Sequence, residues 1–321
     1  MNVVIRGTGS YVPDNIVTNE DLAKIVDTTD EWIRTRTGIE ARRISKKENT
    51  SDLAYMAAKR ALEHVGVGSE KVELIICATM SPDSFMPSTA CIVQEKLGAV
   101  NAAAFDLSAA CTGFIYAIAV ATQFIKTGMY KNALVIGAET LSKLLDWEDR
   151  STCVLFGDGA GAVYLENSDD KDHIKCISLH ADGRKKDLLV CSALPMEGTE
   201  NNTEPSHTIT MQGGEVFKFA VKTIVDNINE ILNQAALKIQ DIKWIIPHQA
   251  NIRIIEHAAK LLEVSTDKFY VNVQDYGNTS AASIGIALDE MVKANELKEG
   301  DKVILIGFGG GMTSGAILLE W

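Results

Sequence analysis

The chain has 321 residues, of which 46% are hydrophobic and 23% charged, the balance of a globular rather than a disordered protein. Its formal net charge of −12, from 43 acidic and 31 basic residues, argues against nucleic-acid binding and against general attraction to anionic membranes. The length suggests about two domain-sized units whose core needs no disulfide or metal, and the six cysteines show no Cys-x-x-Cys spacing.

Strand-like and helix-like segments alternate along the chain. The first is a strand at 3–5, directly after Met1 and in place of a secretion signal, so we expect a cytoplasmic protein. In the first half the pattern predicts helices at 50–64, 88–97 and 113–126 and strands at 74–78, 103–107 and 133–137. In the second half it predicts helices at 216–236, 251–262 and 280–294 and strands at 244–246, 270–273 and 303–306. Terminal hairpins are expected from 154–156 with 162–166 and from 303–307 with 316–320, and an exposed loop at 197–206. This alternation predicts an α/β protein with βαβ units and buried parallel sheets.

One uncharged stretch, residues 107–125, approaches the length of a membrane span. It contains Ser108, Thr112 and Gln123 and follows a strand-like segment, so we interpret it as a helix buried inside the protein.

Three segments of the first half recur in the same order in the second. Residues 71–76 resemble 241–246 and residues 132–137 resemble 302–307, each 170 positions later, whereas 161–166 resemble 315–320 only 154 positions later. The difference of 16 residues indicates an insertion in the first half, at about 138–156. We therefore predict two similar halves, residues 1–170 and 171–321.

Two glycine-rich runs, 157–161 and 307–315, resemble nucleotide-binding loops only superficially. A phosphate loop leads from a strand into a helix, whereas both runs here lead into strand-like segments. They are better interpreted as hairpin turns, or as glycines that let backbone N–H groups approach a substrate oxygen. The consecutive glycines 309–311 favour the second interpretation.

Cys111 is the strongest candidate for a nucleophile. It lies between a buried strand and the start of a helix, where the helix dipole favours a thiolate and lowers the pKa of a cysteine. The alternative is a small buried apolar residue, the usual role of a free cysteine.

His248 and Asn278 are the candidate partners of Cys111. His248 follows a buried strand, at the end where α/β proteins place their chemistry, although a structural histidine is the alternative. Asn278 lies in the second half at a place matching that of Cys111, 167 residues later. The alternative role for Asn278 is that of a helix cap. If the halves face each other, Cys111 and Asn278 point into one shared cleft.

At this point the chain resembles, over its whole length, the β-ketoacyl-acyl-carrier-protein synthase III family. The resemblance implies a thiolase-like fold of two pseudo-symmetric halves in α/β/α/β/α layers, usually as a homodimer. It also implies the initiating condensation of type II fatty acid synthesis. The motifs that carry it are at 28–38, 109–114, 247–251, 277–283 and 307–311.

The resemblance implies a role for each catalytic residue. Cys111 would take the acyl group from an acyl-CoA, acetyl-CoA or a similar primer, giving ping-pong kinetics. His248 and Asn278 would stabilise the enolate formed as malonyl-acyl carrier protein loses CO2. The backbone N–H groups of Cys111 and Gly310 would form the oxyanion hole. The products would be 3-oxoacyl-acyl carrier protein, CoA and CO2, with no metal or other cofactor.

Substrate-contacting residues follow from the same resemblance. Five residues resemble CoA-binding positions: Thr28, Trp32, Arg36, Arg150 and Asn251. The alternative for Trp32 is an ordinary packed aromatic residue. Three cations resemble the docking patch for the acidic carrier protein, with solvated surface charges as the alternative: Lys218, Arg253 and Lys260.

The acyl pocket is where the chain departs from the family pattern. Met86, often phenylalanine in the family, resembles the residue that reaches into the partner subunit's pocket, and Phe308 is the second expected pocket residue. Met312 and Ser314 replace an aromatic residue and a tryptophan. Both straight and branched short-chain acyl groups are therefore possible primers. A condensing enzyme of a secondary pathway and a catalytically silent carrier-binding paralog are the alternative functions, and a thiolase proper fits less well.

Overall fold

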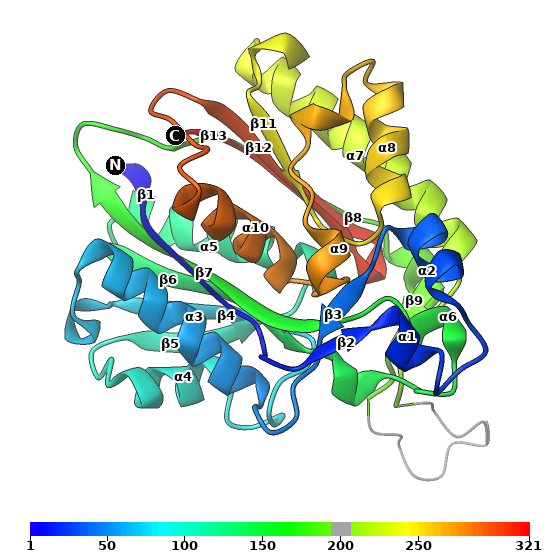
Figure 1. Ribbon diagram of the computed structural model, residues 1–321. Helices are drawn as coiled ribbons and strands as arrows, with labels where there is room; N and C mark the ends of the chain where they lie inside the picture. The colour runs from blue at the N-terminus through cyan, green and yellow to red at the C-terminus, as the bar shows by residue number, and fades with distance from the viewer. Residues whose placement is uncertain (194–206) are drawn as a thin grey trace.

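The computed structural model describes residues 1–193 and 207–321, so the polar run at 197–206 lies outside the described residues. Two β-sheets face each other across a pair of helices (Figure 1). The first sheet has the strand order β1-β7-β6-β4-β5, and the second has the order β11-β12-β13-β8. The strands of the first are β1 (Asn2–Tyr11), β4 (Leu74–Ala78), β5 (Ala103–Leu107), β6 (Asn132–Thr140) and β7 (Asp158–Ser168). Those of the second are β8 (Ile174–Ala181), β11 (Trp244–Pro247), β12 (Lys302–Gly309) and β13 (Thr313–Glu320).

The helices form three layers around these sheets. Helices α5 (Gly113–Lys126) and α10 (Ala282–Lys293) lie in the middle, where their apolar side chains share one core with both sheets. The outer layers are α3 (Thr50–Val65) with α4 (Thr89–Leu97) on the first sheet, and α7 (Gly213–Ala235) with α8 (Ile252–Leu261) on the second. This is the predicted α/β/α/β/α order.

Short elements complete the described part of the chain, and several of them lie near the site described below. They are β2 (Ile16–Thr18), α1 (Asn19–Leu22), α2 (Asp30–Thr37), β3 (Ala41–Arg43), α6 (Arg150–Cys153), β9 (Leu189–Val190), β10 (Thr210–Met211) and α9 (Val273–Tyr276).

Helix α5 is largely apolar because most of its residues are buried, as is typical of a helix inside a protein core, although Gln123 near its end is exposed. It accounts for most of the uncharged stretch at 107–125. None of the helices in the described ranges combines the length and the apolar character needed to cross a membrane.

The two sheets share a four-stranded topology. In the first, β4 pairs parallel with β6, which pairs antiparallel with β7, which pairs antiparallel with β1. In the second, β11, β12, β13 and β8 repeat these three relations. The segments that resemble each other in sequence therefore occupy the same places in the two sheets.

Two predicted strands are wrong, while the other predicted elements are present and most of the strands are longer than expected. Residues 270–273 form no strand, since only an isolated bridge joins Phe269 to Ile245. The ladder stops because the Gln249 side-chain oxygen accepts the Asn272 N–H at 3.1 Å. Residues 154–156 form no hairpin strand either, because the insertion folds into short helices and β7 pairs with β6 and β1.

Candidate active site

Cys111 lies in one turn of 3-10 helix (Ala110–Thr112) that connects β5 to α5. Ala110, just before it, has a φ of 48°, in the left-handed region that few non-glycine residues adopt. This sharp turn places the cysteine at the start of the central helix, where only 7% of its surface is exposed.

The thiol of Cys111 does not have the lowered pKa that the helix start predicted. Burial raises the pKa of this thiol to about 12, and hydrogen bonding with the Ser280 side chain lowers it only in part. The carboxyl group of Glu139, also buried, raises the pKa further. Desolvation by burial is the largest cause, so the free protein holds Cys111 as a neutral thiol.

His248 follows β11, and its backbone N–H donates to the Ile306 carbonyl at 2.8 Å. The side chain is buried, and burial lowers the pKa of the imidazole to about 3, so the ring is neutral. Its Nδ1 lies 2.7 Å from the Ser283 hydroxyl oxygen, and its ring centroid lies 5.0 Å from that of Phe308.

Asn278 is fixed by backbone and side-chain bonds. Its N–H donates to the Leu155 carbonyl at 2.8 Å, and its own carbonyl accepts the Gly157 N–H at 3.0 Å. The side-chain Oδ1 accepts the Ser280 N–H at 2.8 Å. Because the oxygen is engaged, the amide group has its N–H donors left for a ligand.

Cys111, His248 and Asn278 line one cavity of about 230 Å³, together with Arg36 and Asn251. Cys111 also lines a second cavity, of about 420 Å³. The apolar side chains of the second cavity come from several elements: Leu141, Leu144, Phe156, Leu189 and Ile209. The thiol therefore lies where two largely apolar cavities meet, and the first of them also holds the polar side chains of His248 and Asn278.

Neither Phe308 nor Met86 lines this second cavity, and the prediction for Met86 concerned the pocket of a partner subunit. Met86 is 86% exposed, and Phe308 lines the first cavity beside His248. Sequence reasoning missed Leu141 and Leu144, which lie in the insertion on one short helical turn (Leu141–Leu144). Two leucines three residues apart in the insertion were the available signal.

The glycines at the end of β12 allow the two halves to meet closely. A Cβ at Gly309 would lie 2.7 Å from the Cys111 backbone nitrogen, so a larger residue would push the halves apart. Gly310 lines the second cavity together with Cys111. The structure thus brings the backbone of both predicted oxyanion-hole residues beside the thiol.

Trp32, on α2, lies between two guanidinium groups. The Cζ of Arg36 is 4.7 Å from the centroid of its ring and that of Arg150 is 4.8 Å away. The hydroxyl of nearby Thr28 is buried and has no hydrogen-bond partner among the described residues. Asn251 caps α8 and donates from its side chain to the Arg36 carbonyl at 3.0 Å. The structure therefore links four of the five predicted CoA-binding residues by direct contacts.

The three predicted docking cations are all exposed. The Arg253 guanidinium lies 5.8 Å from the ring of Phe217, which lines the first cavity, and Lys218 is the next residue along α7. Lys218 is paired with Glu215 at 2.7 Å. Lys260 lies about two turns further along α8 than Arg253. Arg253 and Lys218 thus border the cavity, and Lys260 stands apart from them.

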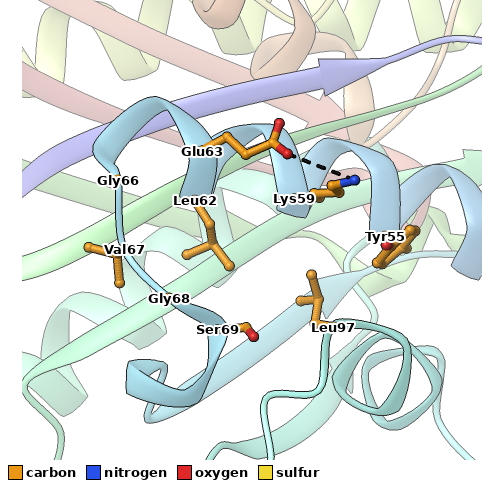
Figure 2. A pocket seen from close by; sticks show the side chains of 9 residues that line it. All are labelled: Tyr55, Lys59, Leu62, Glu63, Gly66, Val67, Gly68, Ser69 and Leu97. Carbon is orange, nitrogen blue, oxygen red and sulfur yellow. Dashed lines mark ion pairs between the residues drawn. The ribbon is translucent and has the colours of Figure 1, made fainter.

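A separate open pocket lies at α3 and α4, where Figure 2 shows the ion pair between Lys59 and Glu63, 3.8 Å apart. These helices cover the face of the first sheet opposite to α5. The sheet therefore separates this pocket from Cys111, and we assign no role to it.

A cysteine at the start of a central helix, facing histidine and asparagine side chains between two α/β halves, defines a condensing acyltransferase of thiolase-like fold. Residues 105–183 match the family model "3-Oxoacyl-[acyl-carrier-protein (ACP)] synthase III", and residues 232–321 match its C-terminal counterpart. The chain is 58% identical to the β-ketoacyl-[acyl-carrier-protein] synthase III of Clostridium acetobutylicum, over 100% of this chain and 99% of that relative.

Solved structures agree with this assignment. The 3-oxoacyl-[acyl-carrier-protein] synthase III of Aquifex aeolicus has a TM-score of 0.94 and 49% identity, covering 99% of this chain and 100% of that one. The priming β-ketosynthase of the R1128 polyketide pathway has a TM-score of 0.93 and 36% identity, covering 99% and 96%. The chain belongs to the β-ketoacyl-[acyl-carrier-protein] synthase III family, whose members carry out the initiating condensation of fatty acid synthesis.

Proposed function

We propose that the enzyme condenses a short-chain acyl-CoA with malonyl-acyl carrier protein to give 3-oxoacyl-acyl carrier protein, CoA and CO2. The observation that carries this proposal is the position of Cys111. It shares one cavity with His248 and Asn278 and a second, largely apolar cavity with side chains suited to an acyl chain.

The first half-reaction is acyl transfer. The Cys111 sulfur attacks the thioester carbonyl of acyl-CoA, the carbon–sulfur bond to CoA breaks, and the proton of the thiol ends on the released CoA. The oxyanion of the intermediate would accept hydrogen bonds from the backbone N–H groups of Cys111 and Gly310. Because the thiol is neutral in the free protein, its proton leaves only as the substrate reacts.

The second half-reaction is decarboxylation and condensation. The neutral imidazole of His248 and the amide of Asn278 donate to the thioester carbonyl of malonyl-acyl carrier protein. Loss of CO2 leaves an enolate whose carbon attacks the acyl group on Cys111, and the thiolate then released takes up a proton. These steps use only thiol, imidazole, amide and backbone groups, so we propose a reaction without metal or redox cofactor.

The substrates occupy the two cavities and their surroundings in this proposal. The adenine of CoA is held between Trp32 and Arg150 by stacking and cation–π attraction, Thr28 and Arg36 also contact CoA, and the pantetheine passes Asn251. Straight and branched short acyl chains both suit the second cavity. Arg253, Lys218 and Lys260 attract the acidic carrier protein, as an enzyme with a net charge of −12 needs a local cationic surface for such a partner.

We also propose a homodimer. β5 is an edge strand of the first sheet, and Phe85 and Met86 beside α4 are 78% and 86% exposed. Two large apolar side chains together at the surface mark an interaction site more often than a free face. The cytoplasmic location stays a prediction.

A role in a secondary pathway is the second candidate, favoured by the similarity to the R1128 priming enzyme. The two functions share their chemistry and differ in the acyl donor. Intact-mass measurement after incubation with a panel of acyl-CoAs tests both. We expect an acyl adduct on Cys111 that malonyl-acyl carrier protein discharges with release of CO2. An adduct confined to another cysteine would disprove the mechanism, and a panel that labels only with an unusual acyl group would favour the secondary pathway.

A further inference from the structure

Ser283, in the first turns of α10, contacts the histidine of the candidate active site from a distant part of the chain. Its side chain is buried, and its Oγ lies 2.7 Å from Nδ1 of His248, 35 residues away in the sequence. The same Oγ accepts the N–H of Gln249 at 3.4 Å. Among the described residues these two are the hydrogen-bonding contacts of the hydroxyl.

The direction of the Ser283–His248 bond follows from placing the protons. If Nδ1–H donated to the hydroxyl, the serine proton would have no acceptor among the described residues. If the hydroxyl donates to Nδ1, its proton is used, its oxygen accepts the Gln249 N–H, and the N–H left over is Nε2–H of His248, a residue that lines the first cavity. An unpaired buried donor is costly, so the second arrangement is favoured.

We propose that Ser283 is a positioning residue that donates to Nδ1 and so holds the neutral imidazole of His248 as the tautomer with its proton on Nε2. A neutral imidazole has one N–H, and accepting at Nδ1 leaves Nε2 as the donor. His248 lines the cavity with Cys111, so Nε2–H is the group available to a substrate carbonyl. This inference rests on the proposed function, in which His248 donates to the malonyl thioester.

The chain offers a matched serine–histidine pair as a control. Ser178 Oγ lies 2.8 Å from His180 Nε2, which also lies 2.7 Å from a Glu230 carboxylate oxygen. His180 is exposed and lies on β8, away from both cavities. Ser178→Ala therefore removes the same kind of bond without touching the site.

The direct test is ¹⁵N NMR of the full-length enzyme labelled at histidine, with the His248 signals assigned by their loss in His248→Asn. The expected result is a proton on Nε2 and none on Nδ1 of His248. A proton on Nδ1 of the wild-type enzyme overturns the proposal, and this outcome needs no serine variant to fold.

The functional test separates the two half-reactions. Ser283→Ala is expected to lower malonyl-acyl carrier protein decarboxylation roughly ten- to a hundredfold, the loss seen when the hydrogen-bond partner of a metal-binding histidine is removed, while acylation of Cys111 keeps its rate. Ser283→Thr, which keeps the hydroxyl, and Ser178→Ala should both retain decarboxylation. Unchanged decarboxylation in Ser283→Ala, or an equal loss in both half-reactions, contradicts the proposal. If the wild-type enzyme neither acylates Cys111 nor decarboxylates the malonyl group, the proposed function itself has failed.

Discussion

The turns that lead into α5 and α10 use the same backbone geometry to present different chemistry. Ala110 in the first turn and Ser280 in the second both have a φ of 48°, and they are 170 residues apart, the spacing of the strand repeat. By backbone, the counterpart of Cys111 is therefore Ala281. The predicted correspondence between Cys111 and Asn278 is wrong by three residues. The site thus joins the helix start of one half to a residue preceding the turn in the other.

The two halves also interlock through equivalent glycines. Gly137 on β6 lies against the backbone of Ala281, and Gly307 on β12 lies against Thr112. Each glycine therefore packs on the catalytic turn of the opposite half. The fit is unequal: a methyl group at 137 would overlap the Ala281 carbonyl oxygen, whereas one at 307 would lie 3.3 Å from the nearest atoms.

The largest expected effect comes from removing the nucleophile of the first half. Cys111→Ala should abolish acyl transfer and condensation, since it removes the thiol that takes the acyl group, while malonyl-acyl carrier protein decarboxylation stays measurable. Intact-mass analysis and CO2 release check the two results. Cys191→Ala, which changes another cysteine lining the second cavity, is the control and should keep its acyl adduct. An adduct that persists in Cys111→Ala would place the nucleophile elsewhere.

The donors of the second half should show the complementary pattern. Asn278→Ala or His248→Ala is expected to lower decarboxylation on the order of 100- to 1,000-fold, the usual cost of removing one oxyanion donor. The acyl adduct on Cys111 should still form. Loss of the adduct in both variants would mean that the halves do not divide the two half-reactions.

The unequal glycine contacts predict unequal stability. Gly137→Ala is expected to lower the free energy of unfolding by about 3 kcal/mol, since backbone must move to admit the methyl group. Gly307→Ala should cost less, because its neighbours include the side chains of Ile115 and Thr112, which can shift. Urea denaturation of both variants measures the difference. Equal losses would contradict the inferred asymmetry.

The sequence predicted most of the layers because apolar periodicity is a local property, as in β4 and α5. It failed where one distant side chain decides the outcome. Residues 270–273 look like a strand, but the Gln249 side chain takes the Asn272 N–H that a ladder would need. The division into halves at residue 170 stays a prediction.

The candidate site was predicted in the same uneven way. Motifs located Cys111, His248 and Asn278, whereas the raised pKa of Cys111 and the serine behind His248 depend on burial between the halves. The cavity wall at Ile209 comes from a segment for which the sequence predicted no element, and the leucine spacing at Leu144 gives only a weak signal. Such features arise only when distant elements pack together, which no local pattern records.

The smallest predicted effect is on the pH dependence of the free energy of unfolding. His248 in the second half lowers it at acidic pH, and Cys111 in the first half lowers it at basic pH. Burial lowers the pKa of His248 to about 3, below its unfolded value of about 6.5, so its contribution to stability is lost as pH falls below about 6.5. Burial raises the pKa of Cys111 to about 12, so its contribution is lost as pH rises above about 8.5. Each loss is about 1.4 kcal/mol per pH unit.

Variants that lack one of these groups isolate each contribution. Relative to the wild type, His248→Asn should gain about 1.4 kcal/mol in free energy of unfolding between pH 7 and pH 5.5, and Cys111→Ala a similar amount between pH 7 and pH 9.5. Urea denaturation at the three pH values measures these differences. Each variant controls for the other, since neither should gain at the opposite end of the range. If the free energy of unfolding changed with pH in the same way for all three proteins, water would reach both side chains and the two halves would not bury them.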